Sequence, residues 1–154
     1  MRERPRMLIS ACLLGVACRY DGGVQAIDCL DELMDRYELI PVCPEQLGGL
    51  PTPRTPSERR GNAVVTRDGQ IVTDAFRRGA EQACRIAGLY GARLALLKAR
   101  SPSCGSRRIY DGSFTGHTIP GTGVAAQALA AAGVSIYSEE EAGQLLEPNR
   151  EGHE

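Results

Sequence analysis

Short apolar runs alternate along this chain with stretches in which apolar residues recur every three or four positions. Four of the runs are bounded by turn residues and predict strands that are covered on both faces, at residues 7–12, 39–43, 93–98 and 134–137. The periodic stretches predict helices at 27–37, 73–87 and 122–132, and a short acidic helix at 139–146. This alternation is typical of an α/β domain with a parallel sheet and right-handed crossovers.

Turn residues mark the ends of these elements and two inserts between them. Thr73 or Asp74 can cap the start of the second helix, and Gly133 is well placed to end the third. Residues 46–60 are rich in glycine and proline, which predicts a shaped loop, and residues 62–72 hold an Asp-Gly turn between alternating runs, which predicts a hairpin. We therefore expect an α/β, three-layer, Rossmann-like fold with a mostly parallel sheet and a small hairpin insert.

The length of 154 residues predicts a single domain over 1–154, with a core at about 7–147 and a frayed tail at 148–154. The start of the chain is basic and then apolar, like a signal peptide. We reject that interpretation because the apolar run carries two cysteines and leads straight into a polar turn. No apolar run approaches the roughly 20 residues of a membrane span. We expect a cytoplasmic protein without a membrane partner.

The charge of the chain is nearly balanced, with 18 Lys and Arg against 19 Asp and Glu. Affinity for a long nucleic acid depends on many contacts from basic residues to phosphates, and the sequence contains no basic block. Trp is absent and Phe occurs twice, so a groove that stacks the bases of a single strand is not indicated either. A small molecule is therefore favoured over a long nucleic acid as the partner.

Six cysteines are dispersed along the chain, at positions 12, 18, 29, 43, 84 and 104. The sequence contains no Cys-x-x-Cys pair, and so gives no support to a zinc ribbon or a thioredoxin motif. Reduced thiols fit a chain of this length better than a secreted disulfide framework does. Cys84 and Cys29 lie on or beside apolar helix stripes and are interpreted as core packing. Cys18 is left open, because it lies in a turn six residues after Cys12.

Three cysteines hold equivalent places with respect to the predicted strands. Cys12 ends the first strand, Cys43 ends the second, and Cys104 follows the third by a few residues. Because ligands of open α/β sheets bind outside the carboxyl ends of the strands, the fold offers a way to gather these thiols at one edge. They are either buried thiols without a shared role, or ligands of a soft ion or an iron–sulfur cluster. Three ligands would leave one iron of a four-iron cluster open to substrate.

Other polar residues and two glycines fall near the same edge. Glu45 and Ser101 are candidate catalytic residues, and Arg54 is a candidate for binding the substrate. Each of the three can equally be a structural loop residue. Gly121 and Gly123 form a weak phosphate-binding fingerprint at a helix start, where backbone N–H groups could meet an anionic or carbonyl ligand. The same glycines can simply serve a tight turn. The two histidines form no metal pair.

Five ordered segments resemble a known family: ISACLLGVACRYDG (9–22), PVCPEQLGGLPTPR (41–54), LKARSPSCG (97–105), IYDGSF (109–114) and GTGVAAQAL (121–129). The family is the short, TudS-type thiouracil desulfidase family, also known as domain-of-unknown-function family 523. The resemblance covers residues 7–137, nearly the whole chain. It implies a [4Fe-4S]-dependent enzyme that removes sulfur from a thiolated pyrimidine without net redox change, giving the oxo base and hydrogen sulfide.

The resemblance also implies the site residues. Cys12, Cys43 and Cys104 are the implied cluster ligands, Glu45 the implied acid/base carboxylate, and Ser101 the nearby hydroxyl. In that scheme the open iron polarises the C=S bond while water attacks the carbon. The substrate is left open between a free base, a nucleoside and thiolated RNA. Two rival functions also remain: a non-catalytic iron–sulfur or zinc module, and an enzyme that uses a cysteine nucleophile without a cluster.

Overall fold

One central parallel sheet organises the computed structural model, which describes residues 4–23 and 26–147. Its strands are β1 (Arg6–Ser10), β2 (Glu38–Val42), β5 (Leu94–Leu97) and β8 (Ser135–Ser138). They are ordered β2-β1-β5-β8, and all three pairings are parallel. Met7 on β1 pairs with Leu39 on one side and with Leu94 on the other. The four predicted strands are confirmed, each within two residues at either end.

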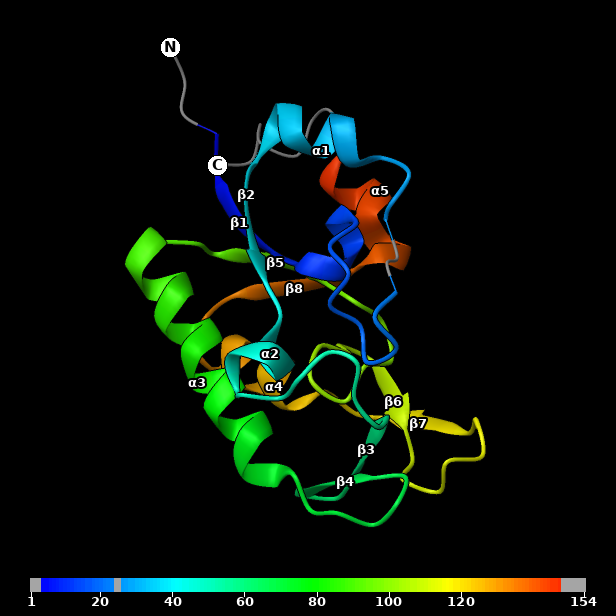
Figure 1. Cartoon of the computed structure of the whole chain (residues 1–154). Helices are drawn as coiled ribbons and strands as arrows, with labels where there is room; N and C mark the ends of the chain where they lie inside the picture. The colour runs from blue at the N-terminus through cyan, green and yellow to red at the C-terminus, as the bar shows by residue number, and fades with distance from the viewer. Residues whose placement is uncertain (1–3, 24–25, 148–154) are drawn as a thin grey trace.

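Helices cover both faces of this sheet (Figure 1). The long helix α3 (Thr73–Tyr90) and α4 (Val124–Ala131) lie on one face, and α1 (Leu30–Arg36) and α5 (Ala142–Leu145) on the other. Neighbouring strand residues point to opposite faces, so Leu8 packs with Ala83 and Leu129, whereas Ile9 packs with Leu33. Full burial of a side chain such as Leu8 or Ile9 contributes roughly 1.5–3 kcal/mol. The predicted three-layer α/β class is confirmed.

The strand order creates a switch point beside β1. The chain passes from β1 to β2 on one side and later fills the other side with β5 and β8. At such a point the crossovers diverge, and a crevice opens outside the carboxyl ends of the strands. The loops that follow β1, β2 and β5 therefore meet at one edge of the sheet.

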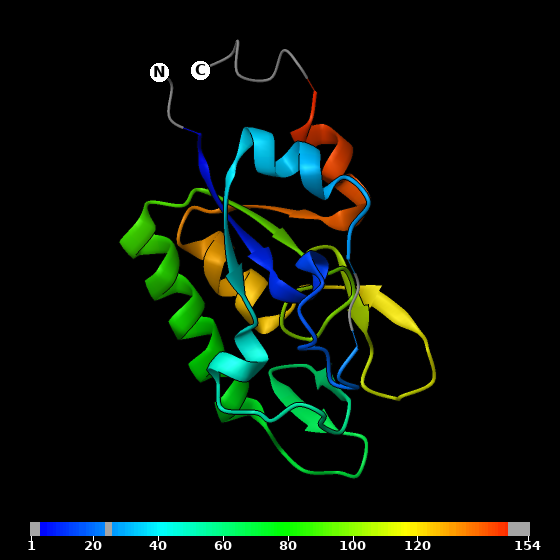
Figure 2. The ribbon, with the colours of Figure 1, turned by 45° about the horizontal axis from the view of Figure 1, so that its top comes forward.

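Two small antiparallel sheets extend from that edge (Figure 2). One pairs β3 (Ser57–Arg60) with β4 (Ala63–Thr66), and the other pairs β6 (Arg108–Tyr110) with β7 (Thr118–Pro120). The hairpin predicted over 62–72 is present in a short form, and its first strand has a second partner. The Asp-Gly turn is present, and beyond it Val65 and Ile71 form an antiparallel bridge. On its other side β4 pairs with the preceding strand, β3, over its full length. The predicted loop 46–60 likewise contains the end of helix α2 (Pro44–Leu47) and all of β3.

The helix ends differ from prediction in two places. Val72, not Thr73 or Asp74, is the N-cap of α3, and the Thr73 hydroxyl instead accepts a hydrogen bond from Val64 N, 3.0 Å away. The predicted acidic helix divides into a 3₁₀ turn, Glu139–Glu141, followed by α5. The predicted frayed tail, 148–154, lies outside the described residues. No helix in the described part of the chain is long and apolar enough to cross a membrane.

Two glycines allow backbones to approach closely beneath the carboxyl edge. A Cβ atom on Gly79 of α3 would lie 1.8 Å from the carbonyl oxygen of Pro44. A Cβ atom on Gly123, at the start of α4, would lie 2.4 Å from the carbonyl carbon of Ser103. Distances this short exclude any side chain. The turns that carry Cys43 and Cys104 therefore rest directly on the backbones of α3 and α4.

Candidate active site

A cavity of about 410 Å³ opens at the carboxyl edge of the sheet. Its size falls within the roughly 300–1,000 Å³ of small-molecule sites. Four cysteines line it, together with Glu45, Arg54, Ser101 and Ser103. The loops after β1, β2 and β5 supply most of this group, as the strand order requires.

The three predicted strand-end cysteines meet in this cavity. Cys12 lies in a 3₁₀ turn, Ala11–Leu14, that follows β1 directly. Cys43 follows β2 and is the N-cap of α2. Cys104 follows β5 in the loop that leads to β6, and it is 5% exposed. All are free thiols. The topology therefore brings together residues that are up to 92 positions apart in the sequence.

Cys104 is held by neighbouring hydroxyls. The Ser10 hydroxyl donates to Cys104 Sγ at 3.3 Å and accepts a hydrogen bond from Lys98 N at 2.9 Å. The Ser103 hydroxyl lies 3.7 Å from the same sulfur. Burial raises the pKa of the Cys104 thiol to about 12, although these hydroxyl contacts act in the opposite direction. Burial, and next the neighbouring Cys43, also raises the pKa of Cys12.

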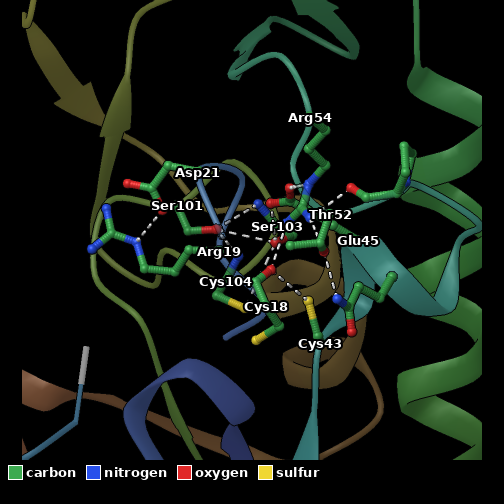
Figure 3. Close-up of polar contacts among 12 residues, drawn as sticks. Cys18, Arg19, Asp21, Cys43, Glu45, Thr52, Arg54, Ser101, Ser103 and Cys104 are labelled. Carbon is green, nitrogen blue, oxygen red and sulfur yellow. Dashed lines mark hydrogen bonds and ion pairs between the residues drawn. The ribbon is translucent and has the colours of Figure 1, made fainter. Parts of the chain in front are cut away.

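Cys18 joins the same cavity, which sequence reasoning had left open. It is 2% exposed, and its carbonyl oxygen accepts from the Cys43 thiol at 3.8 Å and from Arg54 Nη2 at 3.1 Å. Figure 3 shows the sulfur atoms of Cys18, Cys43 and Cys104 gathered below the polar residues of the site. Burial, and next the nearby Cys43, raises the pKa of the Cys18 thiol. Cys29 and Cys84 pack against the two core clusters and do not line the cavity.

Glu45 is fixed at the cavity wall by two donors. Arg54 Nε donates to Glu45 Oε1 at 2.9 Å, and the Ser103 hydroxyl donates to Glu45 Oε2 at 3.0 Å. Side-chain exposure is 14% for Glu45 and 7% for Arg54. A buried charge is tolerated when it is paired and hydrogen-bonded, and both conditions hold here. Each carboxylate oxygen still has a lone pair for a further partner in the cavity.

Ser101 shapes the loop that carries Cys104. Its hydroxyl oxygen accepts from the backbone N–H groups of Ser103 and Cys104, at 3.1 and 3.0 Å. It also lies 3.0 Å from the Ser103 hydroxyl, so a chain of hydrogen bonds runs from Ser101 through Ser103 to Glu45. Sequence reasoning missed Ser103. Its place between Ser101 and Cys104 was the available signal.

The predicted substrate-binding residues take different positions. Arg54 lines the cavity, but its guanidinium is occupied by Glu45, by the carbonyls of Pro51 and Cys18, and by the Thr52 hydroxyl. Gly121 and Gly123 do not line the cavity. Gly123 lies behind the Cys104 loop, where its N–H donates to Gly105 O at 2.7 Å. The glycines that precede α4 thus contact the loop that carries Cys104 from the side away from the cavity.

The donor set of the cavity suits an iron–sulfur cluster. Thiolates are the soft ligands that such clusters use, and four free thiols face this one space. Among the described residues, no group of three or more His, Cys, Asp and Glu side chains is arranged to hold a metal ion. Nucleophilic cysteines have a lowered pKa, whereas burial raises the pKa of the Cys12 and Cys104 thiols.

Comparisons with known proteins agree with this arrangement. A family model described as 2-thiouracil desulfurase matches residues 7–141. A protein of Bacillus subtilis (strain 168), named uncharacterized protein YbbK, is 39% identical over 150 residues, which cover 91% of this chain and 99% of that protein. A solved structure, described as the [4Fe-4S]-dependent thiouracil desulfidase TudS, matches with a TM-score of 0.87 and 45% identity, covering 92% of this chain and 95% of the other.

Proposed function

This chain belongs to the 2-thiouracil desulfurase family, and from that premise we propose that it is a [4Fe-4S]-dependent enzyme acting on a thiolated pyrimidine. The reaction replaces the thiocarbonyl sulfur with oxygen from water and releases hydrogen sulfide. Atoms balance without an electron carrier, because C=S and H₂O become C=O and H₂S. The observation that supports this most is one cavity in which strand-end thiols face a hydrogen-bonded carboxylate.

Cys12, Cys43 and Cys104 are the proposed cluster ligands. They follow three adjacent strands, and the turns that carry Cys43 and Cys104 are seated on helix backbones through Gly79 and Gly123. Cys18 belongs to a longer loop and is proposed to stay unliganded. When bound, a cluster with three protein ligands supplies one open iron that acts as a Lewis acid toward the thiocarbonyl sulfur.

Glu45 is the proposed general acid/base. Its carboxylate lines the cavity, and Arg54 and Ser103 hold it in one orientation without occupying all of its lone pairs. A water molecule between Glu45 and the thiocarbonyl carbon loses a proton to the carboxylate as it attacks. The carboxylate then returns that proton to the sulfur. As the C–S bond breaks and the C=O bond forms, the carboxylate takes the second proton from the new hydroxyl, and this proton completes the hydrogen sulfide.

Ser101 and Ser103 are proposed to orient Glu45. The Ser103 hydroxyl donates to Glu45 Oε2, and Ser101 lies 3.0 Å from that hydroxyl. Ser101 therefore acts on the carboxylate through Ser103, and it also holds the backbone N–H of Cys104. The same serines thus connect the acid/base group to the loop of a cluster ligand.

The substrate is proposed to be a small thiolated base or nucleoside. The cavity is of small-molecule size, and the chain carries a net charge of −1, which gives little attraction for long RNA. Free thiols in this number are kept reduced in a compartment such as the cytoplasm, where we place the enzyme.

The test is sulfide release from 2-thiouracil by anaerobically purified protein. The wild type is expected to be brown, to contain iron and acid-labile sulfide, and to form uracil and hydrogen sulfide in equal amounts over many turnovers. Glu45→Gln is expected to keep its iron and to lose roughly 10²–10⁴-fold in turnover, because the amide cannot accept the proton. A wild-type protein that contains iron and acid-labile sulfide but releases no sulfide from 2-thiouracil would instead support the non-catalytic module.

A further inference from the structure

One wall of the cavity has no part in the chemistry described above. Phe114 and Gly116 line the cavity from the segment between β6 and β7, Tyr110 from the end of β6, and Arg67 from the turn that follows β4. We call these four residues the outer wall, and the cysteines with Glu45, Ser101 and Ser103 the inner wall. Phe114 is one of only two phenylalanines in the chain, and the other, Phe76, is buried in α3.

Glu58 on β3 holds the turn that carries Phe114. Its Oε1 atom accepts from Gly112 N at 2.9 Å and from Phe114 N at 3.1 Å. Glu58 is 9% exposed, and no ion pair involves it among the described residues. A carboxylate buried without a cation is costly unless it is hydrogen-bonded. The two backbone N–H groups therefore stabilise Glu58, and Glu58 in turn fixes the turn.

The turn itself has an uncommon backbone. Phe114 has φ 59°, in the left-handed region that a bulky residue rarely adopts. Arg60 Nε adds a third hydrogen bond from β3, to Gly112 O at 2.8 Å. Strained residues of this kind persist where the surrounding structure over-determines them, and they cluster at ligand sites. The strain therefore presents the Phe114 side chain in a conformation that the loop alone would not choose.

The Phe114 ring is partly buried at the cavity surface, and the Arg67 guanidinium carbon lies 5.6 Å from its centroid. A cation over one face of the ring restricts the orientation of the ring. The aromatic ring is thus held in position beside the cavity that the reacting groups also line. Flat bases stack on such rings with little regard to their substituents.

We propose that Phe114 is the platform on which the pyrimidine ring of the substrate stacks, and that Glu58 is the positioning residue that aims it. The identity of the ring rests on the proposed function. Stacking on the outer wall would present the thiocarbonyl edge to the inner wall. Phe114 then contributes to binding in the ground state and in the transition state alike, and so acts on KM rather than on kcat.

Steady-state kinetics with 2-thiouracil tests the platform. Phe114→Ala is expected to raise KM roughly 5- to 150-fold, the equivalent of one stacked base, while iron content stays unchanged. Phe114→Tyr keeps the ring and is expected to keep KM. Tyr90→Ala removes an exposed aromatic side chain from the far end of α3 and serves as the matched control. An unchanged KM in a Phe114→Ala variant that retains wild-type iron content contradicts the proposal.

Fluorescence gives a readout that does not depend on turnover. The chain has no Trp, so Phe114→Trp carries a single reporter at the platform. Uracil is expected to quench this emission in a saturable way. Dihydrouracil has the same carbonyl and N–H groups but no aromatic ring, and is expected to quench much less. Equal responses to the two compounds, or none to either, would show that no base stacks on residue 114.

A double-mutant cycle tests the positioning role of Glu58. Glu58→Ala is expected to raise KM like Phe114→Ala, and the double variant to add little, because both changes remove one platform. Glu58→Gln retains an acceptor oxygen and is expected to restore most of the affinity. Additive effects would mean that Glu58 does not act through Phe114. If the wild type releases sulfide but the platform tests fail, only this inference is lost. If uracil quenches while no sulfide is released, the proposed function alone is lost.

Discussion

The inner wall of the cavity is carried by the ends of β1, β2 and β5, whereas the outer wall is carried by two short hairpins beyond the sheet (Figure 2). Backbone contacts position the residues of the inner wall. The parallel strands set the spacing between them, and the backbones of α3 and α4 pack against the turns that carry Cys43 and Cys104. The outer residues are placed by side chains, above all by Glu58 and Arg60.

This difference separates two tasks. A cluster with several protein ligands needs thiols at distances that do not change, and close-packed backbone provides them. A substrate platform needs only a defined ring orientation, and a few hydrogen bonds provide that. Changes behind the inner wall should therefore remove the cluster and destabilise the fold, while changes in the outer wall should alter affinity alone.

The largest effect is expected from Gly79→Ala. A methyl group there would lie 1.8 Å from Pro44 O, so α2 and the turn that holds Cys43 must move away from α3. We expect a loss of roughly 3 kcal/mol in the free energy of unfolding, measured by urea denaturation, together with loss of iron. Gly88→Ala on the same helix is the control, because no atom lies within 4 Å of the added methyl. It should stabilise the protein by about 0.5–1 kcal/mol. Equal stability of the two variants would contradict the close-approach argument.

A smaller effect, confined to the chemistry, is expected from Ser103→Ala. The change removes the donor to Glu45 Oε2 while the Arg54 contact remains. One neutral donor to a charged group is worth about 1.5–3 kcal/mol, so kcat should fall roughly 10- to 100-fold with iron retained. Ser106→Ala is the control in the same loop. Its buried hydroxyl lacks a hydrogen-bond partner in the described structure, so stability and kcat should be unchanged or slightly improved.

The parts of the site that sequence reasoning located are those that follow from strand order. Apolar runs identified the strands, and the positions of Cys12, Cys43 and Cys104 after them placed the thiols at one edge. The partners of Glu45 could not be located in that way. Ser103 is 58 positions away, and its contact depends on how the loop after β5 folds over that after β2.

Competition between local signals explains the other differences. Threonine is a residue type that often caps helices, but the Thr73 hydroxyl accepts a hydrogen bond from Val64 N of the neighbouring hairpin. Phe114 occurs in a segment of turn residues, where nothing in the sequence shows a left-handed backbone or the distant Glu58 that supports it. The spacing of apolar residues predicts which side of its own helix or strand a residue occupies. It does not predict contacts with other elements, and the contacts of Thr73 and Phe114 are of that kind.

The smallest effect is expected at the edge of β8, where Glu141 caps a 3₁₀ turn together with Ser138. Burial would raise the pKa of Glu141, but hydrogen bonds from Ser138 N and Arg107 lower it on balance. A lowered folded-state pKa adds stability above the unfolded pKa, and that stability is lost as pH falls through the folded value. Glu141→Gln should therefore cost about 1 kcal/mol at pH 7 and less in acid, measured by thermal unfolding. A difference that grows in acid would reverse the sign of this account.

The central claim is that Cys12, Cys43 and Cys104 hold the cluster. Cys18, the fourth thiol of the cavity, is not a ligand, so one iron has no protein ligand. Iron content per chain, measured on anaerobically purified Cys18→Ser beside the Cys12, Cys43 and Cys104 serine variants, tests it most directly. We predict that Cys18→Ser retains wild-type iron, as does the core control Cys84→Ser, and that each of the other three variants loses it. Loss of iron from Cys18→Ser, or its full retention in any strand-end variant, would contradict the account.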